Sequence, residues 1–213
     1  MHTLKKLAQR FLKRKPLTII LLLVAALLFC VFVFRQAGAW LFVSDPCPSR
    51  LDAICTFAGE NVRVEYSKEL MARFPLAHWF LSDYKNGHSR ILQKQQFDMS
   101  RLTSVDTCKS TISEINTFAA RIRQVRAEHD RTGDTATLRI GLVSSPYHMR
   151  RIKIMSGRRI RMDRIQVYCL PVPFDYYSWN HDSLRYWWRS NAFVHVTTSE
   201  LFKLAYFILT GYF

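Results

Sequence analysis

An uninterrupted apolar run near the N-terminus constrains this chain more than any other feature. Residues 17–34 read LTIILLLVAALLFCVFVF, without a charged side chain. As a helix, this run would extend about 27 Å, close to the roughly 30 Å hydrocarbon core of a bilayer. A small soluble domain could not bury Leu, Ile, Val and Phe on every face of such a helix. We therefore predict one transmembrane helix over residues 17–34.

The charges flanking the run predict its orientation. Residues 1–16 contain six Lys or Arg side chains and no acidic one, whereas Arg35 is the basic residue that closely follows the run. Basic flanks stay in the cytoplasm, so we expect residues 1–16 inside and the remainder outside. Trp40 would then suit the outer interface. A cleaved signal peptide is the alternative, because Ala37-Gly38-Ala39 has the small-x-small form of a cleavage site.

The remainder of the chain is long enough for one domain. Residues 35–50 form a predicted linker, stiffened by its prolines, and residues 51–213 can bury a core of their own. The chain has 31 Lys and Arg against 16 Asp and Glu, a net charge of +15. A basic domain beside a membrane suggests anionic headgroups, phosphorylated ligands or polyanionic envelope polymers, although a solvated basic surface is the simpler interpretation. Nucleic acid is not expected, because no nucleic-acid-binding motif occurs.

Cysteine spacing and absent motifs narrow the chemistry further. No zinc-binding spacing occurs, so no metal site is expected. Disulfides and buried free thiols remain alternatives for the four cysteines beyond the apolar run, which are Cys47, Cys55, Cys108 and Cys169. The P-loop, the dinucleotide fingerprint, the α/β-hydrolase elbow and the zincin motif are all absent. The sequence therefore names no cofactor.

Strand-like and helix-like segments alternate after residue 50. The predicted strands cover 51–57, 77–81, 137–143 and 163–170, with at most one short strand within an irregular 83–104. The predicted helices cover 61–74, 111–129, 147–155 and 198–209. Arg126 falls on the apolar stripe of the 111–129 helix, which suggests that the buried part of this helix ends near Val125. Thr197 and Glu200 have the spacing of a capping box at the start of the last helix.

This alternation predicts the fold class. We expect an α/β domain, a three-layer, doubly wound and mostly parallel sheet, preceded by one N-terminal transmembrane helix. Ligands of such sheets bind at the carboxyl ends of the strands. Two polar clusters fall at such positions, residues 144–151 and 106–111. In the first, Ser145, His148 and Arg151 could bind a phosphate or carboxylate. In both clusters, plain helix capping is the alternative.

The order of these segments resembles the SanA/YdcF/ElyC-like family of bacterial envelope proteins, a domain of unknown function, over roughly residues 50–210. The family's first strand, Gly-rich turn and helix-leading Arg match residues 52–59 and Arg63. Its second turn matches at Ser82, and its acidic residue and helix-opening Thr match Asp106 and Thr111.

The later family elements also have counterparts. The Ser-x-x-His-x-x-Arg run matches Ser145, His148 and Arg151, the Pro-containing strand end matches 171–173, and the closing helix matches 200–204. The turns depart from the family pattern, because Gly59 alone remains of the first and residues 82–84 lack glycine. Such glycines let backbone approach a ligand closely, so this chain resembles a divergent member with a changed or weakened site.

The resemblance implies a role in envelope integrity or biogenesis, with the domain on the periplasmic side of the bacterial inner (plasma) membrane. It implies an anionic, phosphorylated or nucleotide-like ligand. The residues carried over as ligand-binding are Gly59, Arg63, Ser82, Thr111, Ser145, His148 and Arg151. S-adenosylmethionine is associated with some relatives, but the sequence does not indicate it here.

Two alternatives stay open. The first is a hydrolase or transferase acting on a phosphorylated or lipid-linked precursor, with His148 as acid/base and Asp106 orienting it or the ligand. The second is a non-catalytic scaffold that contacts a partner or the bilayer through aromatic residues such as Trp187 and Trp188. The sequence identifies no protein partner, and the lipid bilayer is the one partner it predicts directly.

Overall fold

The computed structural model describes residues 2–105, 110–160 and 162–210, with residues 2–17 and Tyr84 described by their backbone alone. The chain forms two compact units, Met1–Ala37 and Gly38–Phe213. Helix α1, His2–Leu41, makes up the first unit and its last turn enters the second. The predicted span 17–34 lies within α1, and Thr18–Leu41 is long and apolar enough to cross a membrane. The apolar side chains from Ile19 to Phe34 are largely exposed, as a lipid-facing helix requires.

The predicted linker, 35–50, is not a separate segment. Gly38–Leu41 is the helical end of α1, and residues 38–50 belong to the second unit. Asp45 donates its N–H to the carbonyl of Cys169 (2.9 Å) and accepts the Cys169 N–H on its carboxylate (2.8 Å). This segment therefore runs against the last strand of the domain.

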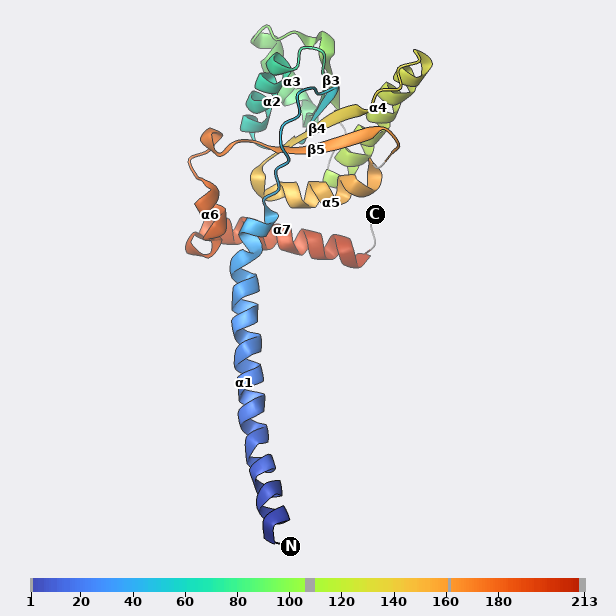
Figure 1. The fold of residues 1–213 in the computed structure, drawn as a ribbon. Helices are drawn as coiled ribbons and strands as arrows, with labels where there is room; N and C mark the ends of the chain where they lie inside the picture. Colours follow the sequence, from blue (N-terminus) through green and yellow to red (C-terminus); the bar gives the residue numbers. More distant parts are fainter. Residues whose placement is uncertain (1, 106–109, 161, 211–213) are drawn as a thin grey trace. The chain divides into compact units, whose positions relative to one another are not determined.

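The second unit contains a five-stranded, all-parallel sheet in the order β3-β2-β1-β4-β5, which confirms the predicted α/β class (Figure 1). The strands are β1 (Ala53–Thr56), β2 (His78–Ser82), β3 (Leu102–Val105), β4 (Leu138–Ser144) and β5 (Ile165–Pro171). Central β1 pairs through Ala53 with His78 of β2 and with Ile140 of β4. The strand order reverses between β1 and β4, and this switch point is where such sheets bind ligands.

Helices cover both faces of the sheet. They are α2 (Asn61–Arg73), α3 (Gly87–Lys94), α4 (Thr111–Arg131), α5 (Met149–Arg159), α6 (His181–Arg185) and α7 (Asn191–Thr210). Side chains of β1 alternate between the two cores: Ala53 and Cys55 pack with α4 and α5, whereas Ile54 packs with α2. The continuous apolar strands follow from burial on both faces.

Three local predictions were wrong. Residues 87–94 form helix α3 inside the expected irregular segment. Helix α7 begins at Asn191, so Thr197 and Glu200 form no capping box and instead lie buried within it. Arg126 is also buried, because its guanidinium donates to the Ala136 carbonyl (2.7 Å) and pairs with Asp130.

The cysteines that the structure describes are free thiols, and Cys108 lies outside the described residues. Cys55 is completely buried, and burial raises the pKa of its thiol well above the usual range. A protonated, inaccessible thiol is a poor nucleophile, so Cys55 is a packing residue. Within 2–105, 110–160 and 162–210, no three His, Cys, Asp or Glu side chains are grouped so as to hold a metal ion.

Candidate functional site

A small crevice lies at the switch point, at the carboxyl ends of β1 and β4. Its volume is about 130 Å³, and it is lined by Phe57, Ala58, Arg63, Thr111, Glu114, Ser144, His148, Arg151 and Ile152. The lining comes from the segments after β1 and β4 and from the first turns of α2, α4 and α5. The topology thus brings together Arg63, Thr111, His148 and Arg151, four of the residues that the sequence singled out.

Arg63, in the first turn of α2, supports one wall of the crevice. Its side chain is buried, its Nε donates to Ser145 Oγ (3.0 Å), and its Nη1 donates to the carbonyls of Phe57 and Ala58. Gly59 makes room for this guanidinium, because a Cβ there would lie 2.8 Å from Nη1. Gly59 also has φ +138°, a conformation that side chains with a Cβ rarely adopt. Gly59 therefore shapes the wall without lining the crevice.

Ser145 points away from the crevice into a second polar group. Its hydroxyl donates to the carboxylate of Glu60 and lies 3.1 Å from the Tyr177 hydroxyl. Tyr147 donates to the other Glu60 oxygen (2.8 Å). Burial would raise the pKa of Glu60, but hydrogen bonds from Ser145 and Tyr147 and the charge of Arg63 lower it. Burial and the Glu60 carboxylate raise the pKa of Tyr147 to about 12. Glu60 is therefore ionised at neutral pH and offsets part of the Arg63 charge.

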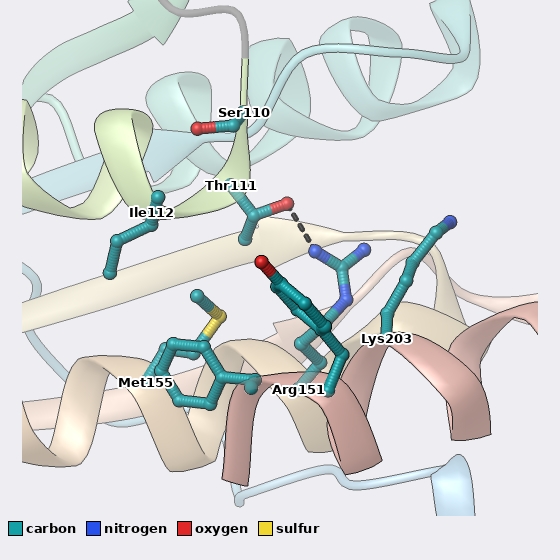
Figure 2. Close-up of a pocket in the computed structure, with 8 residues that line it drawn as sticks. Ser110, Thr111, Ile112, Arg151, Met155 and Lys203 are labelled. Atoms are coloured by element: carbon teal, nitrogen blue, oxygen red, sulfur yellow. Dashed lines mark hydrogen bonds between the residues drawn. The ribbon is translucent and has the colours of Figure 1, made fainter. Parts of the chain in front are cut away.

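On the opposite wall, Arg151 is held by a carboxylate from a distant part of the chain. Its Nε donates to Glu200 Oε2 (2.7 Å), and its Nη1 donates to Thr111 Oγ1, the contact drawn in Figure 2. Glu200 is almost completely buried, and its Oε1 lies 2.9 Å from Lys203 Nζ and 3.1 Å from His148 Nδ1. The Arg151 charge is therefore already paired within the protein.

His148 is held in one orientation by this same carboxylate. We assign the proton to Nδ1, which then donates to Glu200, although Arg151 Nη2 lies 3.3 Å from the same nitrogen. Burial and the charges of Arg63 and Arg151 lower the pKa of His148 and outweigh the raising effect of Glu200. The imidazole is therefore neutral at pH 7, with Nε2 as a hydrogen-bond acceptor or base.

Two further lining residues, Glu114 and Ser144, complete the crevice. Glu114 accepts the Ala58 N–H (2.7 Å), and burial raises the pKa of its carboxyl despite the lowering effect of Ser82 and of both guanidinium groups. The hydroxyl of Ser144 is buried in the lining and has no hydrogen-bond partner among the described residues. The same holds for the buried hydroxyl of Ser82, which lies close enough to Glu114 to affect its pKa but does not line the crevice.

A larger cavity of about 450 Å³ adjoins this site. It shares Thr111 and Arg151 with the crevice and is otherwise lined by Ser110, Ile112, Met155, Lys203, Tyr206 and Phe207. Figure 2 shows the Arg151 guanidinium reaching toward Thr111 with the Lys203 amine on the same side, while Ile112 and Met155 lie on the other. The cavity therefore has an apolar part and a cationic rim.

The sequence analysis missed several carboxylates of the site, and one carboxylate that it did predict remains untested by the structure. Asp106, the predicted orienting acid, lies outside the described residues. Glu114 stands on the buried stripe of α4, four residues before buried Phe118, and this spacing was an available signal. Glu200 likewise lies four residues before buried Leu204. A carboxylate on the apolar face of a helix needs a buried partner, so the positions of these two residues in α4 and α7 indicated that each would have one.

Comparison with protein-family models, with curated proteins and with solved structures found no match to this chain.

Proposed function

We propose that this protein is anchored in a bacterial plasma membrane and binds a small anionic, phosphorylated ligand in the switch-point crevice, in a role in envelope integrity or biogenesis. One observation carries the binding proposal. Buried Ser144 has no hydrogen-bond partner among the residues described, yet its hydroxyl lines a polar crevice with Arg63, His148 and Arg151. A buried hydroxyl without a partner is costly, and a phosphate oxygen would supply the missing acceptor.

The charges around the crevice refine this proposal. Arg63 lies near Glu60, and Arg151 is paired with Glu200, so the crevice is less basic than the sequence suggested. Burial raises the pKa of Glu114, and its Oε1 accepts the Ala58 N–H, so this carboxyl is already engaged within the wall of the crevice. The ligand would share Arg151 with Glu200.

Ligand binding should appear as thermal stabilisation that depends on Arg151. With the full chain in mild detergent and pyrophosphate as the probe, we expect the melting temperature to rise with concentration, because a ligand of the folded state stabilises it. Arg151→Ala and Ser144→Val should abolish the rise. Arg150→Ala is the matched control, because Arg150 donates to the Trp40 carbonyl (2.8 Å) and does not line the crevice. Equal rises in all four proteins would contradict the site.

A hydrolase or transferase is the second candidate, favoured by the contact between His148 and Glu200. A carboxylate on Nδ1 fixes the imidazole with Nε2 available as a base, as catalytic histidines require. The same samples incubated with p-nitrophenyl phosphate distinguish the two functions. Turnover that is lost in His148→Ala would favour the enzyme, whereas pyrophosphate binding without turnover would favour the binding protein.

The proposed orientation places the domain outside the cytoplasm, on the basis of the flanking charges. In spheroplasts that express the chain with a C-terminal tag, added protease should therefore remove the tag without lysis. A cytoplasmic protein measured in parallel controls for leakage. Protection of the tag until the cells are lysed would place the domain in the cytoplasm and reverse the proposed orientation.

A further inference from the structure

Helix α7 has a packed face and an exposed apolar face. Thr197, Glu200, Leu204 and Phe207 are buried against the domain. On the opposite face, Phe202, Tyr206 and Leu209 follow one another at helical spacing and are 75%, 65% and 84% exposed, with Tyr206 at the edge that also lines the larger cavity. Among the described residues of the second unit, most of the large apolar side chains that are more than half exposed belong to this helix, and Leu76 is the other. A soluble domain has no reason to concentrate such side chains on one surface helix.

The position of α7 in the fold brings it near Gly38, where the second unit begins. Gly38 packs directly on Trp187, since a Cβ on Gly38 would lie 2.6 Å from the Trp187 ring. Trp187–Arg189 in turn packs against α7, which begins at Asn191, and Figure 1 shows α6 and α7 at the end of the domain where Gly38–Leu41 enters. Three residues lie between Phe34 and Gly38, so the two are joined by at most about 14 Å of chain. Whatever the tilt of α1, this end of the domain stays beside the membrane surface.

The side chains around this end are those that bilayer interfaces favour. Trp40 is 43% exposed, and the Arg150 guanidinium lies 4.8 Å from its ring centre. Arg189 is likewise 4.8 Å from the ring centre of Tyr186, and Arg185 and Arg189 are exposed. Aromatic rings at the headgroup level, with arginines that reach anionic phosphates, are typical of interfacial segments.

We propose that the Phe202, Tyr206 and Leu209 face of α7 is a membrane-binding surface, seated at the boundary between headgroups and acyl chains of the bilayer that holds α1. A helix lying in the plane of the interface buries its exposed apolar side chains shallowly, while the other face of α7 stays packed on the domain. The proposal rests on the membrane anchoring of α1 and is independent of ligand binding in the crevice.

A transmembrane α7 is the main rival, because Asn191–Thr210 is also long and apolar enough to span. The ion pairs of Glu200 with Arg151 and Lys203 argue against it, since a spanning α7 would leave this buried carboxylate without the Arg151 partner that α5 supplies. A second copy of the chain is the other rival. The aromatic and arginine side chains around this face, however, are those that suit a lipid boundary. Both rivals predict different probe depths.

Depth-dependent quenching in vesicles tests the proposal. The full chain, with Cys30, Cys47 and Cys108 replaced by serine, would carry one cysteine at Phe202→Cys, Leu209→Cys or Leu76→Cys, labelled with a nitrobenzoxadiazole probe. Buried Cys55 and Cys169 would remain unlabelled. Leu76 is the matched control, because it is 93% exposed and lies in the turn between α2 and β2. None of these exposed positions packs in a core, so the variants keep the fold.

In phosphatidylethanolamine and phosphatidylglycerol vesicles, we expect nitroxide at acyl carbon 5 to quench the 202 and 209 probes at least twofold more than the 76 probe. We also expect carbon 5 to quench them more than carbon 12. Stronger quenching by carbon 12 would make α7 a span, and quenching equal to the 76 probe would mean that lipid does not cover this face. Unquenched probes that dim with protein density would identify a second copy. Each of these results would overturn the proposal, whether or not pyrophosphate binds.

Discussion

Replacing Glu200 with alanine should cost about 3–5 kcal/mol of unfolding free energy, because it leaves a buried cation without its partner. The Glu200 side chain is 1% exposed and the Arg151 side chain 12% exposed, with 2.7 Å between Nε and Oε2. The same change removes the acceptor of His148 and a partner of Lys203. Urea unfolding of the full chain in mild detergent, followed by tryptophan fluorescence, measures the loss.

A surface carboxylate provides the matched control for this prediction. Glu128 pairs with Arg131 on α4, but the two side chains are 57% and 72% exposed. Glu128→Ala should change stability little, because water already screens this pair. Combining Glu200→Ala with Arg151→Met should recover part of the loss, since the unpaired charge is then gone. A Glu200→Ala protein as stable as Glu128→Ala would contradict the buried ion pair.

The pH dependence of unfolding checks the same contacts. Burial would raise the pKa of Glu200, but His148 and Arg151 hold it well below its usual 4.5. Its contribution is therefore complete above about pH 4.5 and lost as the pH falls toward the lowered value. His148 also has a pKa below its usual 6.5, so the free energy of unfolding begins to fall as the pH drops below about 6.5. Glu200→Ala should lose only the Glu200 contribution to the decline below pH 4.5, because Glu60 also has a lowered pKa and still contributes.

The sequence predicted the sheet because its strands are apolar runs of strand length bounded by turn residues. The 51–57 run contains β1, and the 111–129 stripe contains most of α4, since burial on a helix repeats every three to four residues. Helix α3 was missed because Ser89 and Leu92 are its buried residues, too few to form a recognisable stripe in eight residues. The start of α7 was missed because a capping pair in sequence cannot be told from two residues on one buried face.

The crevice was predictable to the extent that topology alone determines it. Parallel strands end at one edge of a sheet, so the runs after β1 and β4 had to meet, and Arg63, Thr111, His148 and Arg151 do so. The carboxylate that pairs with Arg151 comes from an element that is distant in the sequence. The contact between Glu200 and Arg151 spans 49 residues, and no local pattern encodes a partner at that distance.

Helix α7 connects the two surfaces that concern function. Glu200 on its packed face holds Arg151 and His148, whereas Phe202, two residues later, belongs to the proposed membrane face. Any shift of α7 relative to the bilayer would therefore move a carboxylate that positions crevice residues. Weaker pyrophosphate binding in Glu200→Ala, together with unchanged binding in Phe202→Cys, would separate the two roles.

Replacing Arg63 with methionine should destabilise the domain by roughly 3 kcal/mol or more, because each buried acceptor left unpaired costs about 1–3 kcal/mol. Arg63 is 4% exposed and serves the carbonyls of Phe57 and Ala58 and the hydroxyl of Ser145. Arg63→Lys should recover only part of this stability, since one ammonium cannot reproduce the planar fork of the guanidinium. Arg73→Met, at an exposed position on the same helix, is the control and should have little effect.

The same variant tests why Gly59 is glycine. Gly59→Ala alone should be strongly destabilising, because its Cβ would meet the Arg63 guanidinium at 2.8 Å and its φ of +138° strains any side chain. In the Arg63→Met background the steric contact disappears and only the backbone strain remains. The double variant should therefore lose less stability than the sum of the single losses, a coupling that urea unfolding of the four proteins measures. If the two losses of stability were strictly additive, the backbone conformation alone would require this glycine. The Arg63 side chain would then play no part in the requirement.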